Sequence, residues 1–455
     1  MTITSDTIAA ISTAPGEGAV AIIRVSGPAA ISAADKIFKC SIPLPSQRKA
    51  PALVYGQVVS EGIILDEALL LIMRSPHSYT REDVVEFQCH GGTISAKRVL
   101  RAILSAGIRQ ADPGEFTRRA FINGRLDLLQ AEAVLDLIRA QTDRCATMAL
   151  EQMDGSLTNS FAKVYYDTLA VTADLEATLD FTDGELHDSF MSGMIQRLND
   201  IAQQIDALLA TWDEGHVIRE GALVVISGKP NAGKSTLLNS LLGRNRVIVS
   251  PIPGTTRDVI EEQIIIDGIP IRLVDTAGLR LSECVLEQEG VRRARNQIEK
   301  ADINIHVIDS SKQLEEDDLN NITAMDPKKS IIVLNKTDLG CAIDLAAVSA
   351  SDIVESQLIN NKGVAKIQKL ILGKLGVQKF SSHRFAIAER HRIILIDSRN
   401  NLLEAVRMLE TSDESYIVIA ASNVKNALEN IGRAIGKTYD QELLNSIFTR
   451  FCIGK

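Results

Sequence analysis

Residues 228–235 combine glycines, a lysine and a serine in an order that suits phosphate binding. They read Gly-Lys-Pro-Asn-Ala-Gly-Lys-Ser and match the pattern G-x-x-x-x-G-K-[ST]. Glycines let the backbone curl until its N–H groups point at phosphate oxygens, and the N-terminus of a following helix adds a favourable dipole. We therefore expect Lys234 to reach the β- and γ-phosphates of a nucleotide and the Ser235 hydroxyl to bind Mg²⁺.

Two further motifs follow in the order of a guanine nucleotide site. Residues 275–278 read Asp-Thr-Ala-Gly, where Asp275 can hold magnesium through water and the glycine N–H can meet the γ-phosphate. Residues 335–338 read Asn-Lys-Thr-Asp. The Asp338 carboxylate can accept from both N1–H and the N2 amino group of guanine, donors that adenine does not present in that arrangement. The three motifs together predict GTP rather than ATP.

Strands and helices must hold these motifs in place. An apolar run at 223–227 directly precedes the first motif, and residues 236–242 after it have the texture of a helix. Further apolar runs alternate with helix-like stretches at 264–266, 271–274, 303–308 and 331–334. This alternation is typical of a parallel sheet covered by helices, so we expect an α/β domain.

The segments on either side of this domain have different patterns of apolar residues. Roughly the first 115 residues read as short apolar strands broken by turns, which predicts an α+β unit. Helical spacing begins after Pro113-Gly114, persists to about Trp212 and returns after about Ser381. Two helical blocks around an α/β block predict that the α/β domain is inserted into one helical domain. Two independent bundles are the alternative.

Composition narrows the classes of function. The chain has 455 residues, which predicts about three domains, and its net charge is −9. An acidic chain with 11 Phe, 6 Tyr and 1 Trp is a poor candidate for coating nucleic acid or stacking single-stranded RNA, so an RNA partner would need a local patch or a second protein to hold it. The six cysteines form no C-x-x-C pair, which argues against a zinc site and a disulfide framework.

We expect a cytoplasmic protein without a membrane partner. No window of 18 uncharged apolar residues occurs, as a transmembrane helix would require. The first basic residue is Arg24, whereas a secretory signal carries positive charge at its start.

The nucleotide motifs resemble those of translation-factor-related GTPases and, more narrowly, of the bacterial tRNA-modification GTPases of the MnmE (TrmE) family, in the TrmE-Era-EngA-like superfamily. In Ras-like switches a glutamine after D-x-x-G positions the attacking water. Here that position is Leu279, which can do neither acid–base nor hydrogen-bonding work. The resemblance implies that a potassium ion and a downstream glutamate replace the glutamine. Spacing selects Glu287 as this catalytic residue beside Lys234, although Glu283 and Glu289 are close enough to compete.

The resemblance also implies the remaining nucleotide and metal contacts. Residues 244–258 resemble the family's potassium loop and first switch, with Thr256 as the second magnesium hydroxyl beside Ser235. The implied potassium ligands are Asn231, Ser250, Ile252 and Thr255. The expected GTP contacts are Asn231, Ala232, Gly233, Lys234, Ser235, Thr236, Ser250, Pro251, Ile252, Pro253, Gly254, Thr255, Thr256, Asp275, Thr276, Ala277, Gly278, Asn335, Lys336 and Asp338.

The last guanine-contacting element of such proteins normally reads Ser-Ala-x. Two places compete for it in this chain, Ser349-Ala350 and Ser356-Gln357, and the second lies nearer the helix expected at 363–372. The sequence does not choose between them.

The resemblance covers nearly the whole chain. It includes patterns at 6–10, 15–20, 24–27, 78–83, 86–92, 113–121 and 451–455. The N-terminal domain of the family resembles the folate-binding domains of aminomethyl-transfer enzymes and binds a 5-formyl-tetrahydrofolate-type carrier between two protomers. The folate contacts carried over are Arg24, Glu86, Arg125 and Lys455, where Arg125 replaces a lysine of relatives and so alters the donor geometry. Cys452 matches the cysteine of the family's C-x-G-K motif, and its role stays open.

The implied architecture has three domains. An N-terminal α+β domain for tetrahydrofolate binding and dimerisation spans 1–118, and a discontinuous all-α helical domain spans 119–215 and 381–455. A P-loop GTPase domain of the Ras-like α/β class is inserted at 216–380.

The function implied is a potassium-dependent GTP hydrolase that works as a homodimer with MnmG, a partner that carries FAD. Together they would install an aminomethyl-type group, such as carboxymethylaminomethyl, at C5 of wobble uridine 34 of tRNA, with a one-carbon unit from tetrahydrofolate. The alternative is a GTP-controlled switch for ribosome assembly, because related G-domains with the same leucine do that work. Such switches tend to append a basic RNA-binding domain, and residues 381–455 offer none, with ten Lys and Arg against nine Asp and Glu.

Overall fold

The structure is a computed structural model, and it divides into two compact units. It describes residues 6–41, 43–49, 51–178, 188–245, 261–275, 297–343, 352–377, 386–411 and 415–455. The first unit comprises Met1–Leu135, Met153–Asp174 and Val424–Lys455, and the second comprises Asp136–Gln152 and Leu175–Asn423. The domain boundaries expected at 118, 215 and 380 stay a prediction.

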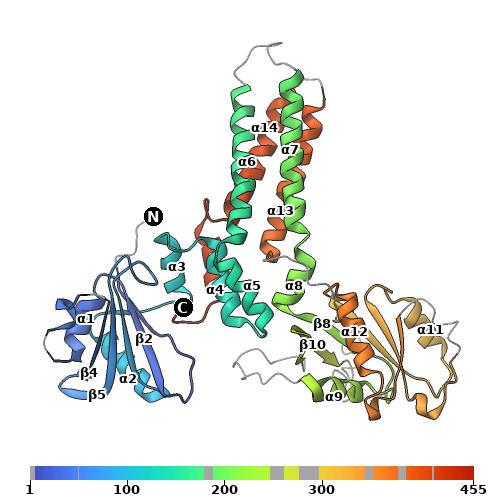
Figure 1. The fold of residues 1–455 in the computed structure, drawn as a ribbon, viewed down its shortest axis with the longest axis horizontal. Coiled ribbons are helices and arrows are strands. Elements are labelled where there is room, and N and C mark those ends of the chain that lie inside the picture. The colour runs from blue at the N-terminus through green and yellow to red at the C-terminus, as the bar shows by residue number, and fades with distance from the viewer. Residues whose placement is uncertain are drawn as a thin grey trace, which may run out of the picture. The chain divides into compact units, whose positions relative to one another are not determined.

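The first unit is built on a seven-stranded sheet in the order β3-β4-β5-β6-β2-β1-β7 (Figure 1). All neighbouring strands in it are antiparallel except β1 and β7. The strands are β1 (Ile8–Ile11), β2 (Val20–Ser26), β3 (Phe38–Lys39), β4 (Ala52–Ser60), β5 (Ile63–Met73), β6 (Val84–His90) and β7 (Arg109–Gln110). This unit confirms the α+β fold predicted for the start of the chain.

Helices cover one face of this sheet, and the other face carries polar and exposed apolar side chains. Helices α1 (Ala30–Ile37) and α2 (Thr93–Ser105) pack against Ala21, Ile23 and Val25 of β2, all of which are buried. Because successive side chains of a strand point to opposite faces, Arg24 lies on the other, open face. It is paired in register there with Glu86 of β6.

Residues from both ends of the chain build a second core of the first unit. Helix α3 (Glu115–Ile122) and the start of α4 (Leu128–Arg139) supply Phe121 and Leu128. Helix α15 (Gln441–Phe448) and the residues after it supply Leu444, Phe448 and Phe451. Helices α4, α6 (Ser156–Thr178) and α14 (Ser415–Ala434) each contribute residues to both compact units.

The segment Cys452–Lys455 is fastened to the N-terminal part of the same unit. Ile453 forms an antiparallel bridge with Pro113, and the N–H of Phe116 donates to the carbonyl oxygen of Lys455 at 3.2 Å. Gly454 has φ 98° and packs so closely on Ile11 that a Cβ atom would overlap the Ile11 carbonyl. Glycine is therefore required at this position.

The second unit contains a six-stranded sheet in the order β13-β12-β11-β8-β10-β9. Its neighbouring strands are parallel except β9 and β10. The strands are β8 (Ala222–Ser227), β9 (Glu261–Ile266), β10 (Ile269–Asp275), β11 (Ile303–Asp309), β12 (Ser330–Asn335) and β13 (Asp352–Glu355). Every residue of β8 and β12 is buried, as expected for inner strands of a parallel sheet, and the predicted α/β domain is confirmed.

The second unit also contains helices (Figure 1). They are α5 (Asp143–Met153), α7 (Asp188–Leu209), α8 (Trp212–Glu220), α9 (Lys234–Asn245), α11 (Glu316–Thr323), α12 (Val364–Lys374) and α13 (Glu389–Leu409). The long helices α7 and α13 lie side by side and share an ion pair between Arg399 Nε and Asp206 Oδ1 at 2.6 Å. Among the helices of the described residues, none is both long and apolar enough for a membrane span.

Candidate nucleotide-binding site

The loop between β8 and α9 has the backbone shape that its glycines predict. Gly228 has φ 134° and Gly233 has φ 112°. A Cβ atom at Gly228 would overlap the Val307 carbonyl, and one at Gly233 would overlap the Asn335 side chain. Asn231 also adopts a left-handed conformation, with φ 62°. Only glycine fits the first two positions, so the loop can curl tightly at the carboxyl end of β8.

Lys234 lies at the start of α9 and points back into this loop. Its side chain is almost fully buried, and its ammonium group donates to the carbonyl oxygen of Lys229 at 2.7 Å. Lys229 itself is held by ion pairs to Glu315 Oε2 at 2.6 Å and Asp318 Oδ2 at 2.8 Å, and these hydrogen bonds raise the pKa of Lys229. The loop therefore presents the ammonium group of Lys234 from an anchored backbone.

Ser235 and Asp275, both predicted to serve magnesium, lie together. The Ser235 hydroxyl donates to Asp275 Oδ2 at 3.3 Å, although the two residues come from α9 and the end of β10. One hydroxyl and one carboxylate are hard oxygen ligands of the kind that Mg²⁺ accepts while it keeps several waters. The donor set of this pair therefore fits magnesium.

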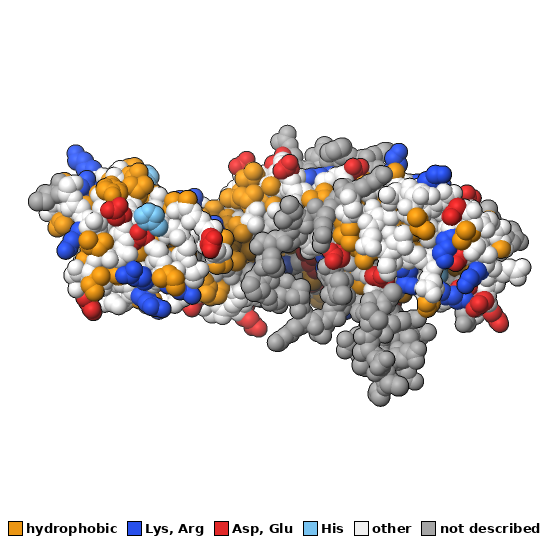
Figure 2. Space-filling model, turned by 90° about the horizontal axis from the view of Figure 1, so that it is seen from below, with side chains coloured by type: hydrophobic (Ala, Val, Ile, Leu, Met, Phe, Trp, Pro, Cys, Tyr) orange, Lys and Arg blue, Asp and Glu red, His pale blue; other side chains and the backbone are white. Residues whose placement is uncertain are grey.

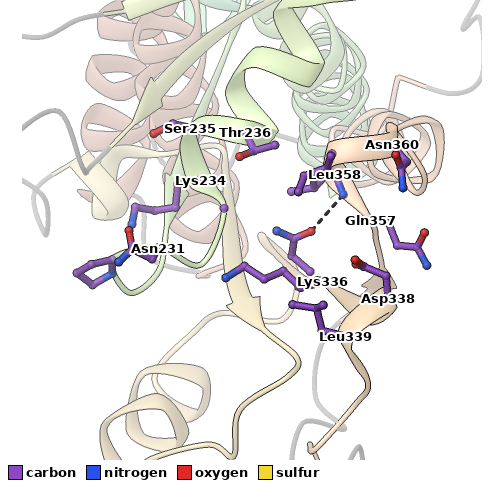
Figure 3. A pocket seen from close by; sticks show the side chains of 14 residues that line it. Asn231, Lys234, Ser235, Thr236, Lys336, Asp338, Leu339, Gln357, Leu358 and Asn360 are labelled. Carbon is purple, nitrogen blue, oxygen red and sulfur yellow. Dashed lines mark hydrogen bonds between the residues drawn. The ribbon is translucent and has the colours of Figure 1, made fainter.

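Asn335 ties the phosphate loop to the opposite wall of the site. Its Nδ2 donates to the Ala232 carbonyl at 2.9 Å, and its Oδ1 accepts from the N–H of Leu358 at 3.2 Å (Figure 3). The side chain is buried, so both bonds are shielded from water. The asparagine is thus a structural pin between two loops.

Lys336 is fixed by an acidic partner, Asp309, that no sequence motif indicated. It has φ 64°, and its ammonium group lies 2.6 Å from Asp309 Oδ2 at the end of β11. Burial alone would raise the pKa of Asp309, but hydrogen bonds from Lys336 and Ser311 hold it below its ordinary value. The ion pair leaves the aliphatic stem of Lys336 to line the site.

Lys234, Ser235, Asn335 and Lys336 line one cavity of about 530 Å³, which is in the range of small-molecule sites (Figure 3). It extends from the phosphate loop to the Asn-Lys-x-Asp motif. Its lining consists of Pro230, Asn231, Gly233, Lys234, Ser235, Thr236, Asn335, Lys336, Asp338, Leu339, Gln357, Leu358, Ile359 and Asn360. The first and third motifs, about a hundred residues apart, therefore meet at one site.

The structure favours one of the two candidates for the last guanine-contacting element. Ser356 follows β13, and its carbonyl accepts from the Thr337 N–H and hydroxyl at 3.3 and 3.1 Å. Gln357 lines the cavity. Ser349 and Ala350 lie outside the described residues. The position of Gln357 on the cavity wall supports Ser356-Gln357 as this element.

A buried polar group lies behind the phosphate loop, and no sequence motif indicated it. The Ser227 hydroxyl is 2.9 Å from both Asn304 Oδ1 and His306 Nδ1, and all three residues are buried. Burial lowers the pKa of His306 to about 4, with further lowering by Lys234 and Lys229. The imidazole is therefore neutral at physiological pH. A polar residue at the end of a buried strand, next to the motif, was the available signal.

Several predicted residues fall outside the described part of the chain. They are Ser250, Pro251, Ile252, Pro253, Gly254, Thr255, Thr256, Thr276, Ala277, Gly278 and Glu287, with the competitors Glu283 and Glu289 and the adjacent Leu279. Their roles stay predictions.

In the first unit, three of the four predicted folate residues, Arg24, Glu86 and Arg125, lie together with Tyr79 and Phe116. Arg24 Nε pairs with Glu86 Oε1 at 2.8 Å, and the Arg24 guanidinium lies over the rings of both Tyr79 and Phe116, at 5.2 and 5.6 Å. Arg125 lies over the Tyr79 ring at 4.6 Å and donates to its carbonyl. We call this set, Arg24, Tyr79, Glu86, Phe116 and Arg125, the Tyr79 cluster.

Lys455 joins the Tyr79 cluster through its backbone. Its carbonyl accepts from the Phe116 N–H, as described above, and Cys452 is exposed and presents its carbonyl to the Gly114 N–H at 3.4 Å. The two aromatic residues of the cluster were not predicted as contacts, although both fall within stretches that carried the resemblance.

A P-loop, a Ser–Asp pair for magnesium and an Asn-Lys-x-Asp motif around one cavity of a parallel sheet define the class of P-loop GTPases. A model of the family described as "GTP-binding protein TrmE N-terminus" matches residues 7–125, and one described as "MnmE helical domain" matches residues 128–452. The chain belongs to the MnmE family of tRNA modification GTPases.

Full-length relatives agree with this assignment. A protein of Natranaerobius thermophilus named tRNA modification GTPase MnmE is 42% identical over 99% of this chain and 100% of its own length. Proteins of the same name from Alkaliphilus oremlandii and Clostridioides difficile are 39% and 40% identical, each over 99% of both chains.

Proposed function

We propose that the chain is the GTP-hydrolysing subunit of a tRNA modification enzyme. With the FAD-containing partner MnmG it installs an aminomethyl-type group at C5 of wobble uridine 34, using a one-carbon unit from tetrahydrofolate. The observation that carries the proposal is the cavity of about 530 Å³ that joins the phosphate loop to Asn335, Lys336 and Asp338. Family membership extends it from GTP hydrolysis to tRNA modification.

In this proposal different residues of the site bind the phosphates, the magnesium ion and the guanine base. Lys234 and the backbone N–H groups of the loop bind the β- and γ-phosphates, and Ser235 with Asp275 holds Mg²⁺. The metal, when bound, neutralises charge that develops on the phosphate oxygens. Asp338 accepts hydrogen bonds from the guanine edge, and Lys336 covers a face of the ring with its stem.

The potassium ion and Glu287 complete the proposed hydrolysis step. Asn231, on the cavity wall, would hold the ion, which acts in place of an arginine finger, and Glu287 would orient the attacking water. Turnover should be fast with potassium and slow with sodium at equal ionic strength. Glu287→Ala should lose most hydrolysis and keep nucleotide binding, and unchanged turnover at saturating potassium would refute that role.

The Tyr79 cluster is the proposed folate site. A carboxylate such as Glu86 can accept from the paired N–H donors of a pterin, while Arg24, Arg125 and Lys455 suit the negative glutamate tail. Flat aromatic and guanidinium groups in one place also suit a ring ligand. The cluster supports 5-formyl-tetrahydrofolate or a related folate as the ligand.

Exposed apolar side chains on the open sheet face support a homodimer. Leu53 and Tyr55 of β4 are 60% and 64% exposed, and Val20 of β2 is 53% exposed. They share this face with Arg24 and Glu86, because Leu53 pairs with Leu71 and Leu71 pairs with Glu86. Apolar groups on one open sheet face are typical of an association surface. Tyr55→Lys should shift sedimentation from dimer to monomer.

The surface charge supports a partner that shares the hold on tRNA. On the face that Figure 2 shows, Lys and Arg side chains are scattered among acidic and hydrophobic ones. Tight tRNA binding by one protein alone usually needs a dense basic surface, and the net charge of the chain is −9. MnmG is proposed to supply much of this contact.

The decisive experiment is mass analysis of the wobble uridine in tRNA from cells that lack this protein. Unmodified or intermediate uridine at position 34 is expected, and re-expression of the protein should restore the modified nucleoside. A normal nucleoside profile together with accumulated ribosome precursors would favour the assembly switch instead.

A further inference from the structure

Gln357 stands at the base end of the nucleotide cavity, where such GTPases normally carry alanine. It follows β13 directly, lines the cavity and is only partly exposed. Figure 3 shows its side-chain amide beside Asp338, with Asn360 farther along the rim. Within the described part of the chain, the Gln357 amide makes no hydrogen bond, so it is available to a ligand.

The main-chain N–H groups around Gln357 are already used in hydrogen bonds within the protein. The Gln357 N–H donates to the Lys362 carbonyl at 3.2 Å, and the reciprocal bond from the Lys362 N–H has the same length. The Leu358 N–H is used by Asn335 Oδ1, and the Ser356 N–H by the Leu334 carbonyl at 2.8 Å. The three main-chain donors at 356–358 are therefore all engaged within the protein.

Two further side-chain donors at this end, those of Lys336 and Asn335, are engaged too. The ammonium group of Lys336 is paired with Asp309, and Nδ2 of Asn335 is bonded to Ala232. Leu339 and Ile359 line the same end and are 67% and 84% exposed, so they offer apolar surface for the faces of a ring. The side chains left to face a ligand's polar edge are the acceptor Asp338, the free amide of Gln357 next to it and, farther along the rim, the amide of Asn360.

Guanine has a matching edge. Its N1–H and N2 amino group are donors that a carboxylate can accept together, and the neighbouring O6 is an acceptor that needs a donor from the protein. An acceptor that is shielded from water and left without a donor weakens binding. This edge of guanine therefore fits a site in which Asp338 accepts from N1–H and the 2-amino group and a neighbouring side chain donates to O6.

Resting on the proposed GTP binding, we propose that the side-chain amide of Gln357 donates to guanine O6 and is a specificity-determining residue of this site. The main-chain N–H of Gln357 is bonded to the Lys362 carbonyl, so the side chain is the donor that this residue has free. Asp338 and Gln357 together then recognise the three hydrogen-bonding groups of this guanine edge, which are the 2-amino group, N1–H and O6.

The test compares GDP with 6-thioguanosine diphosphate. In this analogue sulfur, a weak acceptor, replaces O6, whereas N1–H and the 2-amino group are unchanged. Dissociation constants are measured by calorimetry on the full chain. Gln357→Ala should weaken GDP binding about fivefold, the loss expected for one hydrogen bond, and thio-GDP binding less than about twofold. Gln357→Glu places a carboxylate against O6 and should weaken GDP more than alanine does.

Two further variants make the result unambiguous. Gln313→Ala removes an exposed glutamine that does not line the cavity and should leave both constants unchanged. Asn360→Ala removes the other amide at the rim. Equal losses for GDP and thio-GDP in Gln357→Ala, no loss at all, or an oxygen-dependent loss in Asn360→Ala would each overturn the assignment. Failure of the unaltered protein to bind GDP would instead overturn the proposed function itself.

Discussion

The nucleotide cavity of the second unit and the Tyr79 cluster of the first are assembled in different ways. The cavity takes its groups from short motifs that each follow a strand of one parallel sheet, so Ser227, Asp275 and Asn335 all end strands at the same edge. The cluster takes its residues from distant parts of the chain, and Lys455 is bonded to it through Phe116. Parallel strands end at the same edge of a sheet and so bring the residues that follow them together, whereas the residues of the Tyr79 cluster meet only through packing between distant parts of the chain.

This difference has an energetic side. The cavity is held by buried hydrogen bonds between neighbouring loops, such as those of Asn335. The cluster is held by an ion pair and by cation–ring contacts, which contribute about 0.5–2 kcal/mol each and depend on every partner. Substitutions in the nucleotide cavity should therefore reduce GTP binding or hydrolysis alone. Substitutions in the Tyr79 cluster should change both folate binding and the stability of the first unit.

Lys234→Ala should give the largest effect and test the independence of the two sites. Removing the cation at the β- and γ-phosphates should slow GTP hydrolysis at least about 100-fold, while titration with 5-formyl-tetrahydrofolate stays unchanged. Lys312→Ala, an exposed lysine outside the cavity, is the matched control. Equal damage to folate binding would show that the two regions are one functional system.

Asp338→Asn should come next and sharpen the account of the base end. Hydrogen bonds to a charged group contribute about 1.5–3 kcal/mol, so affinity for GDP should fall roughly 10- to 100-fold. Xanthosine diphosphate should bind better than before, because the new amide can donate to its oxygen at carbon 2. Nucleotide titration measures the affinities for GDP and for xanthosine diphosphate, and Asp326→Asn is the control. An unaltered preference for guanine would contradict the role of Asp338.

Glu86→Gln should produce a smaller and mixed effect in the first unit. The amide accepts from Arg24 less strongly than a carboxylate, so folate affinity should fall about tenfold and the melting temperature by a few degrees. GTP turnover should stay within twofold of the unaltered protein. Glu17→Gln, on an exposed turn, is the control. A folate affinity unaffected by Glu86→Gln would remove this cluster as the binding site.

The smallest effects concern two histidines whose pKa values move in opposite directions. His306 has its pKa lowered to about 4 by burial, so its stabilising contribution is present above pH 6.5 and is lost as pH falls toward 4. His90, bonded to Asp66 at 2.6 Å, has its pKa raised, so its contribution is present below pH 6.5 and is lost as pH rises through the folded-state pKa.

Urea unfolding at several pH values can separate these histidines. Between pH 7 and 5.5 the protein should lose about 1 kcal/mol through His306, and His306→Asn should remove that loss. His90→Asn should instead flatten the decline between pH 6 and 8. The same slope in both variants and the unaltered protein would mean that neither histidine governs it.

The two regions also differ in how far sequence could predict them. The spacing of Gly228, Lys234 and Asp338 follows from phosphate and guanine chemistry, and the apolar runs beside them predicted the sheet. Nothing local marks Arg24 or Lys455, because their roles arise from register and from a tail packed against β1, and only the resemblance indicated them. Partners outside motifs, such as Asp309 for Lys336 and His306 for Ser227, depend on which strands lie adjacent.

The tail at Cys452–Lys455 has a consequence for protein synthesis. The core of Phe121 and Leu128 is completed by Leu444, Phe448 and Phe451, and the tail then bonds to Phe116. Ribosomes release a chain from its N-terminus onward, so residues 175–423 can leave the exit tunnel and fold while the first unit still waits for its last segment. The strands of the first unit are therefore synthesised before residues 175–423, but the core of that unit is complete only after residues 441–451 have been synthesised.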